Sequence, residues 1–175
     1  MVLYPGEAGQ ESTRGATYHV APAGEFQPGA WVRELDDRDP WHNIMREYNE
    51  EFLNAPAART GSPEDGESPP YSQLRDAIKD KALTRWFLGI GIDPVTLAAD
   101  LLTACVFERP AFVRIFGKEP WTSIEGPIRP YPFAAAQIER FARIEATAAR
   151  AMLPGGSALL LLAWEHRAAL GLPAG

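Results

Sequence analysis

Between residues 40 and 53 the large apolar side chains recur with helical spacing. They lie four, three and four positions apart: Trp41, Met45, Tyr48 and Phe52. This spacing gathers them on one face of a helix, which would bury them against a core. Asp39 can cap the first turn, and Pro40 suits the first helical position, where its missing N–H costs nothing. The pattern therefore predicts a helix over 40–53.

Other stretches of the chain show the periods of strands and helices. Runs rich in β-branched and aromatic residues, bounded by turn residues, predict strands at 1–4, 16–21, 31–35, 85–92 and 101–107. Helical spacing and composition predict helices at 71–83, 110–116, 133–149 and 157–170, with a short helical turn at 93–99.

Two stretches are rich in glycine and proline and interrupt this pattern. Residues 55–70 are expected to form a mobile loop, and residues 117–132 an irregular segment. Neither side of the first loop could close a core alone, so 1–175 is expected to be a single domain. We predict an α+β fold, with a small mixed sheet built from 16–21, 85–92 and 101–107 and flanked by helices.

Composition narrows the functional classes. No apolar run approaches the ~18 residues of a membrane span, and the N-terminus lacks the basic and apolar regions of a signal peptide. The net charge is −6, and the Lys and Arg residues are scattered singly. A duplex-binding domain needs a basic face, so direct nucleic-acid binding is not expected. The single cysteine, Cys105, fits a reducing cytoplasm and is expected to be a small buried residue.

A second face of the helix predicted at 40–53 is acidic. Glu47, Glu50 and Glu51 share it, with Arg46 one turn before Glu50. Like charges four positions apart cost about 0.2–0.5 kcal/mol per pair. One interpretation is a solvated surface. The other is a site for Mg²⁺, which prefers carboxylate oxygens and keeps waters for a phosphate substrate.

The residues around this face resemble the Nudix box. Residues 46–51 are similar to its Arg-Glu-aliphatic-x-Glu-Glu core, and residues 18–25 resemble the strand and turn that open it. Arg38 stands where the family has a further glutamate, residues 53–54 replace its terminal glycine, and the loop between the two parts is longer. Few residues precede the box, so we expect a Nudix-like sheet that is shortened at its N-terminus.

In the Nudix family this strand, loop and helix hold Mg²⁺ against a nucleoside diphosphate derivative. The resemblance implies a nucleotide-like small molecule as ligand and assigns roles to six residues. The metal ligands would be Glu47, Glu50 and Glu51, the catalytic residues Glu50 and Glu51, and the ligand contacts Arg46, Gly24 and Glu25.

A second resemblance covers residues 17–168. Segments 19–28, 46–53, 88–99 and 154–158 with 163–167 are similar, in the same order, to the C-terminal effector region of actinobacterial helix-turn-helix transcriptional regulators. This resemblance implies a regulatory domain that senses a ligand or binds a protein, without its own DNA-binding module. Its partner would be a DNA-binding regulator protein. The alternative is a Mg²⁺-dependent Nudix hydrolase of nucleoside diphosphate derivatives.

Overall fold

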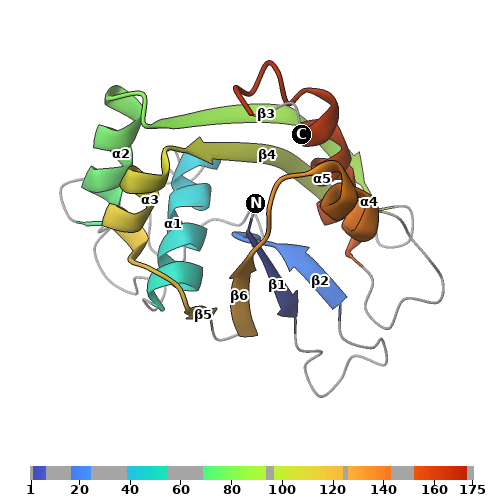
Figure 1. The fold of residues 1–175 in the computed structure, drawn as a ribbon, viewed down its shortest axis with the longest axis horizontal. Coiled ribbons are helices and arrows are strands. Elements are labelled where there is room, and N and C mark those ends of the chain that lie inside the picture. Colours follow the sequence, from blue (N-terminus) through green and yellow to red (C-terminus); the bar gives the residue numbers. More distant parts are fainter. Residues whose placement is uncertain are drawn as a thin grey trace. The chain divides into compact units, whose positions relative to one another are not determined.

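A computed structural model describes residues 2–6, 17–24, 39–54, 69–93, 97–123, 126–142 and 152–172. In these ranges the strands are β1 (Val2–Gly6), β2 (Thr17–Val20), β3 (Leu83–Ile92), β4 (Ala99–Phe107), β5 (Trp121–Ser123) and β6 (Gly126–Pro130). The helices are α1 (Pro40–Leu53), α2 (Tyr71–Lys79), α3 (Arg109–Phe116), α4 (Ala135–Ala142) and α5 (Pro154–Glu165) (Figure 1). The fold is α+β, as predicted.

Contacts between residues divide the chain into two compact units. The first unit comprises Met1–Val20, Thr84–Val106 and Arg129–Gly175, and the second comprises Ala21–Leu83 and Phe107–Ile128. Each unit is described below by itself. None of the helices formed by the described residues is long and apolar enough to cross a membrane.

The second unit is built around α1, whose bounds match the predicted helix. The Asp39 carboxylate accepts a hydrogen bond from the Trp41 N–H at 2.9 Å, and Pro40 occupies the first turn. At the other end Asn54 adopts a left-handed conformation with φ 51° and ends the helix. The four predicted core residues are all buried: Trp41, Met45, Tyr48 and Phe52.

The apolar face of α1 packs on aromatic side chains from α3, β5 and the last residue of β4. Tyr48 stacks on Phe116 with ring centroids 5.2 Å apart. The ring centroid of Phe52 lies 5.5 Å from that of Phe112 and 5.9 Å from that of Trp121. Figure 1 shows α1, α2 and α3 grouped together. We predicted that α1 would pack on the sheet of residues 16–21, 85–92 and 101–107; its observed aromatic partners are instead mainly α3 and β5.

Residues 117–132 were predicted to be irregular, which is wrong for much of this segment. Trp121 pairs with Ile128, and Ser123 with Gly126, so β5 and the start of β6 form an antiparallel pair in the second unit. The Trp121 indole N–H also donates to the Phe116 carbonyl at 3.0 Å. Of the prolines that suggested irregularity, Pro120 directly precedes β5, whereas Pro127 and Pro130 lie within β6.

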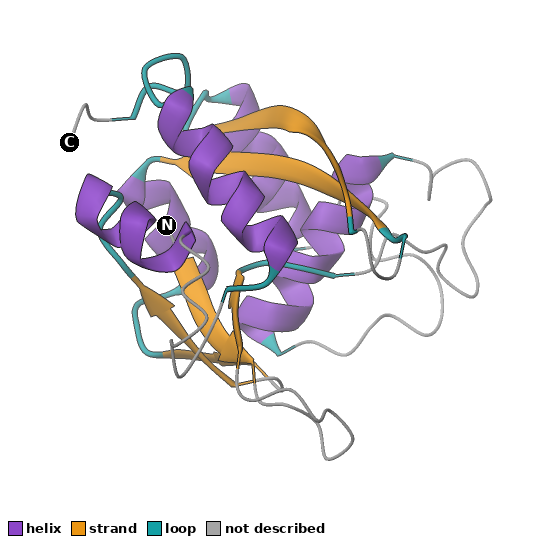
Figure 2. Cartoon of the chain, turned by 90° about the vertical axis from the view of Figure 1, so that its right-hand side faces the viewer, coloured by secondary structure: helices purple, strands orange, loops and turns teal. Residues whose placement is uncertain are grey.

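In the first unit β1 lies between two antiparallel partners. Leu3 pairs with Val20 of β2 on one side and with Arg129 of β6 on the other. β3 and β4 form a separate two-stranded sheet and run side by side (Figure 2). The predicted mixed sheet is therefore wrong, because the sheets are antiparallel and the strand at 17–20 pairs with neither β3 nor β4.

The core of the first unit lies between α4, α5 and β2. It consists of Ile138, Phe141, Ala142, Met152 and Leu160. Tyr18 contacts Phe141 edge-on at 5.3 Å, and the Leu153 N–H donates to the Tyr18 carbonyl at 3.0 Å. This hydrogen bond fixes the start of α5 against β2.

Several predicted element bounds differ from the structure. α2 ends at Lys79, and α5 begins at Pro154, which suits a first helical turn, instead of at residue 157. The helical turn predicted at 93–99 is wrong at its end, because Ala99 already belongs to β4 and Leu97 has φ 59°, while residues 94–96 lie outside the described residues. Predictions for 25–38, 55–68 and 143–151 lie outside the described residues, and these include the strand at 31–35, most of the loop at 55–70 and the end of the helix at 133–149.

Candidate functional site

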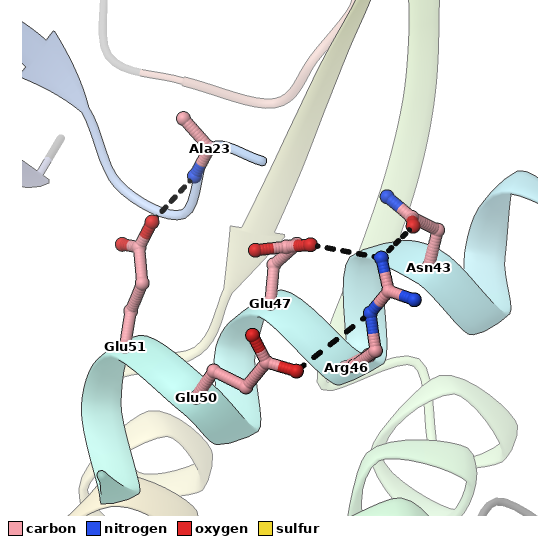
Figure 3. Close-up of polar contacts among 6 residues, drawn as sticks. All are labelled: Ala23, Asn43, Arg46, Glu47, Glu50 and Glu51. Atoms are coloured by element: carbon pink, nitrogen blue, oxygen red, sulfur yellow. Dashed lines mark hydrogen bonds and ion pairs between the residues drawn. The ribbon is translucent and has the colours of Figure 1, made fainter. Parts of the chain in front are cut away.

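The acidic face of α1 is organised by Arg46. Its guanidinium donates from Nη2 to Glu47 Oε1 at 3.2 Å, and its Nε lies 3.8 Å from Glu50 Oε1 (Figure 3). Nη2 also donates to Asn43 Oδ1. One cation therefore lies between two carboxylates of the same helix. It offsets the repulsion that adjacent glutamates would otherwise add to α1.

Glu51 makes a different contact, with the loop that follows β2. The residue is 6% exposed, and its Oε1 accepts a hydrogen bond from the Ala23 N–H at 2.9 Å (Figure 3). A buried carboxylate is costly unless hydrogen bonds stabilise it. The Ala23 amide supplies one, so Glu51 fixes the loop of residues 21–24 to the helix.

Gly24 makes a second contact between this loop and α1. A Cβ atom built on Gly24 would overlap the carboxylate of Glu47, so the loop backbone lies directly against that side chain. Glycine at this position permits the close approach. We call Ala23, Gly24, Glu47 and Glu51 the loop–helix junction.

The structure thus brings together five of the six residues that the sequence nominated. Arg46, Glu47, Glu50 and Glu51 share one region of α1, and Gly24 lies against it. The sixth, Glu25, lies outside the described residues. Ala23 and Asn43 were not predicted. Asn43 could have been found from its position three residues before Arg46 on the helix, whereas nothing in the sequence pointed to the Ala23 amide.

The carboxylates match Mg²⁺ in donor type, since this ion takes oxygen ligands. Their arrangement is different from that of a metal site. Glu47 and Glu50 pair with Arg46, and Glu51 accepts a hydrogen bond from the Ala23 N–H. Within the part of the chain that the structure describes, no three His, Cys, Asp or Glu residues form a group that could hold a metal ion. Metal binding by Glu47, Glu50 and Glu51 stays a prediction.

No protein-family profile, curated protein or solved structure matches this chain. The resemblances to the Nudix box and to the regulator region therefore rest on the sequence motifs alone.

Proposed function

We propose that the chain is a regulatory domain that senses a nucleotide-like small molecule at Arg46 and the loop–helix junction. The main support for the proposal is that the charged side chains on the acidic face of α1 bind to other groups of the same protein. Arg46 pairs with Glu47 and Glu50, and Glu51 is buried against the Ala23 amide. The positive charge that a metal would bring to Glu47 and Glu50 is already supplied by the protein.

The same contacts give a route from ligand binding to loop position. A phosphate group is a strong acceptor for a guanidinium and would compete with Glu47 for Arg46. Glu47 in turn lies against Gly24. Release of Glu47 from Arg46 would therefore alter the packing of the loop on α1, and this change is what a partner protein could recognise.

The partner that the regulator resemblance suggests is a DNA-binding regulator protein. The test is to mix the purified chain with such a regulator from the same organism, with and without ADP, and to measure binding by interferometry. Binding whose affinity changes with ADP supports a sensor. If none of the organism's regulators of this type binds, the partner part of the proposal fails.

Ligand sensing itself is tested by calorimetric titration of ADP and of a nucleotide sugar. We expect Arg46→Gln to raise the Kd at least about tenfold, because a charge-assisted contact to phosphate is lost. Arg114→Gln removes an equally charged, exposed residue of α3 and is the matched control. Equal binding by both variants, or no binding of either compound to the unaltered protein, would reject a nucleotide sensor at Arg46.

A Mg²⁺-dependent hydrolase of nucleoside diphosphate derivatives is the second candidate. It is favoured by the placement of three carboxylates on α1 beside a glycine-containing loop. Glu47, Glu50 and Glu51 would hold the metal, which would supply charge neutralisation of a phosphate. Arg46 would then orient a glutamate.

The two candidates separate in a pair of measurements. Mg²⁺ or Mn²⁺ is first titrated by calorimetry, and nucleotide sugars, dinucleotides and oxidised nucleotides are then screened for phosphate release. Metal binding and turnover that are both lost in Glu50→Gln or Glu51→Gln would establish the enzyme. Nucleotide binding without turnover would support the sensor.

A further inference from the structure

β3 exposes apolar side chains that a folded protein normally covers. Trp86 is 37% exposed, and Phe87, Ile90 and Ile92 are 63%, 61% and 67% exposed. The two-residue period of a strand aligns Trp86, Ile90 and Ile92 on one side. Contiguous exposed apolar surface of this kind is typical of an interaction site.

Among the described strands, β3 has a neighbour on one edge only. β3 pairs with β4 in a sheet of two strands, and no other strand of the described ranges joins them. Sheet edges are usually protected by charged residues or proline, which prevent pairing with another chain. The seven residues from Trp86 to Ile92 contain neither. A sheet of only two strands is marginally stable and gains from a third.

The sequence of β3 is complementary to itself about Gly89. If two copies pair antiparallel with Gly89 opposite Gly89, Arg85 of each copy faces Asp93 of the other, the residue that directly follows β3, so oppositely charged residues meet at both ends. Four of the large apolar residues also meet one another in this register, whereas Phe87 faces a glycine. The remaining opposed pairs are Trp86 with Ile92, Leu88 with Ile90 and Phe87 with Gly91.

Other registers lose this match. A shift by two residues, which centres the pair on Leu88, places Arg85 opposite Gly91 and Asp93 opposite Leu83, so neither charged residue faces an opposite charge. Opposite charges and large apolar residues facing each other across strands stabilise a pair, whereas like charges destabilise it. The centre at Gly89 also removes side chains from the two-fold axis, where the two backbones meet.

We propose that β3 pairs with β3 of a second copy and forms a symmetric dimer with a continuous four-stranded sheet, β4-β3-β3-β4. Main-chain hydrogen bonds between the open edges hold the two copies together. The opposed Trp86 and Ile92 extend an apolar surface across the two-fold axis, and the ends are fixed by the Arg85–Asp93 pairs. This dimer is independent of the function proposed for Arg46.

Charge reversal tests the register directly. Arg85→Asp places carboxylates opposite each other at both ends, and Asp93→Arg places guanidinium groups there. We expect either change to raise the dimer Kd about tenfold. The double variant Arg85→Asp/Asp93→Arg restores opposite charges and should return the Kd to within about threefold of the unaltered protein. Arg114→Asp on α3 is the control of equal charge change.

Ile90→Lys tests the apolar contacts of the proposed dimer. Ile90 is 61% exposed, so the variant should keep its fold, which circular dichroism checks. It should weaken the dimer by more than about a hundredfold in Kd. The measurement for all variants is sedimentation velocity over a wide concentration range, together with hydrogen exchange of the β3 amides, which the dimer should protect. A monomer at every concentration, or a dimer unaffected by Ile90→Lys and by both single reversals, would overturn the proposal.

Discussion

The acidic face of α1 and the apolar face of β3 depart from the usual distribution of side chains in opposite ways. On α1 a carboxylate, Glu51, is buried and bonded to a backbone amide. On β3 large apolar residues are exposed. Buried charge and contiguous exposed apolar surface are each informative, because folding alone does not favour them. The buried carboxylate of α1 thus bonds to the loop within the protein, whereas the apolar side chains of β3 are exposed to solvent.

The largest expected effect is the difference in stability loss between a buried phenylalanine of α1 and an exposed phenylalanine of β3. Phe52→Ala should lower the free energy of unfolding by about 3–5 kcal/mol, because it leaves a cavity among Phe112, Phe116 and Trp121. Phe87→Ala removes the same ring from an exposed position and should cost less than about 1 kcal/mol in the monomer. Urea denaturation at low protein concentration measures both. Equal losses would mean that β3 is covered within one copy.

The next effect concerns the buried carboxylate. Glu51→Ala removes the acceptor of the Ala23 N–H and should cost about 1–3 kcal/mol. Glu51→Gln keeps an acceptor oxygen of similar reach and should cost less. Thermal unfolding of the two variants gives the comparison. A loss that is no larger for Ala than for Gln would show that the Ala23 contact does not stabilise the loop.

The smallest effect is expected at Gly24. Gly24→Ala introduces a Cβ where the Glu47 carboxylate lies, so that flexible side chain must move, at about 1 kcal/mol or less. Gly91→Ala on β3 meets only ordinary contacts, at 3.7 Å or more, and is the matched control. Both are compared by urea denaturation. The double variant Gly24→Ala/Glu47→Ala should be more stable than Gly24→Ala. If it is not, the loss of stability in Gly24→Ala does not come from the close contact between Gly24 and Glu47.

Local signals explain which parts of the fold were predictable. α1 was placed correctly because a capping Asp39, Pro40 and the spacing of four apolar residues agree within one short segment. β5 and β6 were missed because they are short and contain Pro127 and Pro130, which suggest irregular structure. The predicted pairing of the strands was also wrong. Pairing depends on residues far apart in sequence, and the alternating pattern of one strand does not identify the strand beside it.

The candidate site was likewise predictable only where its contacts are local in sequence. Helical periodicity brought Arg46, Glu47 and Glu50 together, because they lie within two turns of one helix. The contact from Ala23 to Glu51 spans 28 positions and is made by a main-chain N–H. Every residue except proline carries this group, so no residue type marks its role.

The division of the chain into discontinuous units has a consequence for synthesis on the ribosome. The second unit ends at Ile128, whereas the first needs Arg129–Gly175 to complete its core. Val2 and Leu3 must wait for Pro130 and Arg129 before β1 gains its partner in β6. Domains generally fold as they are made, from the N-terminus onward. In this chain β1 is translated before α1, yet it gains its partner in β6 only after the helices around α1 have emerged.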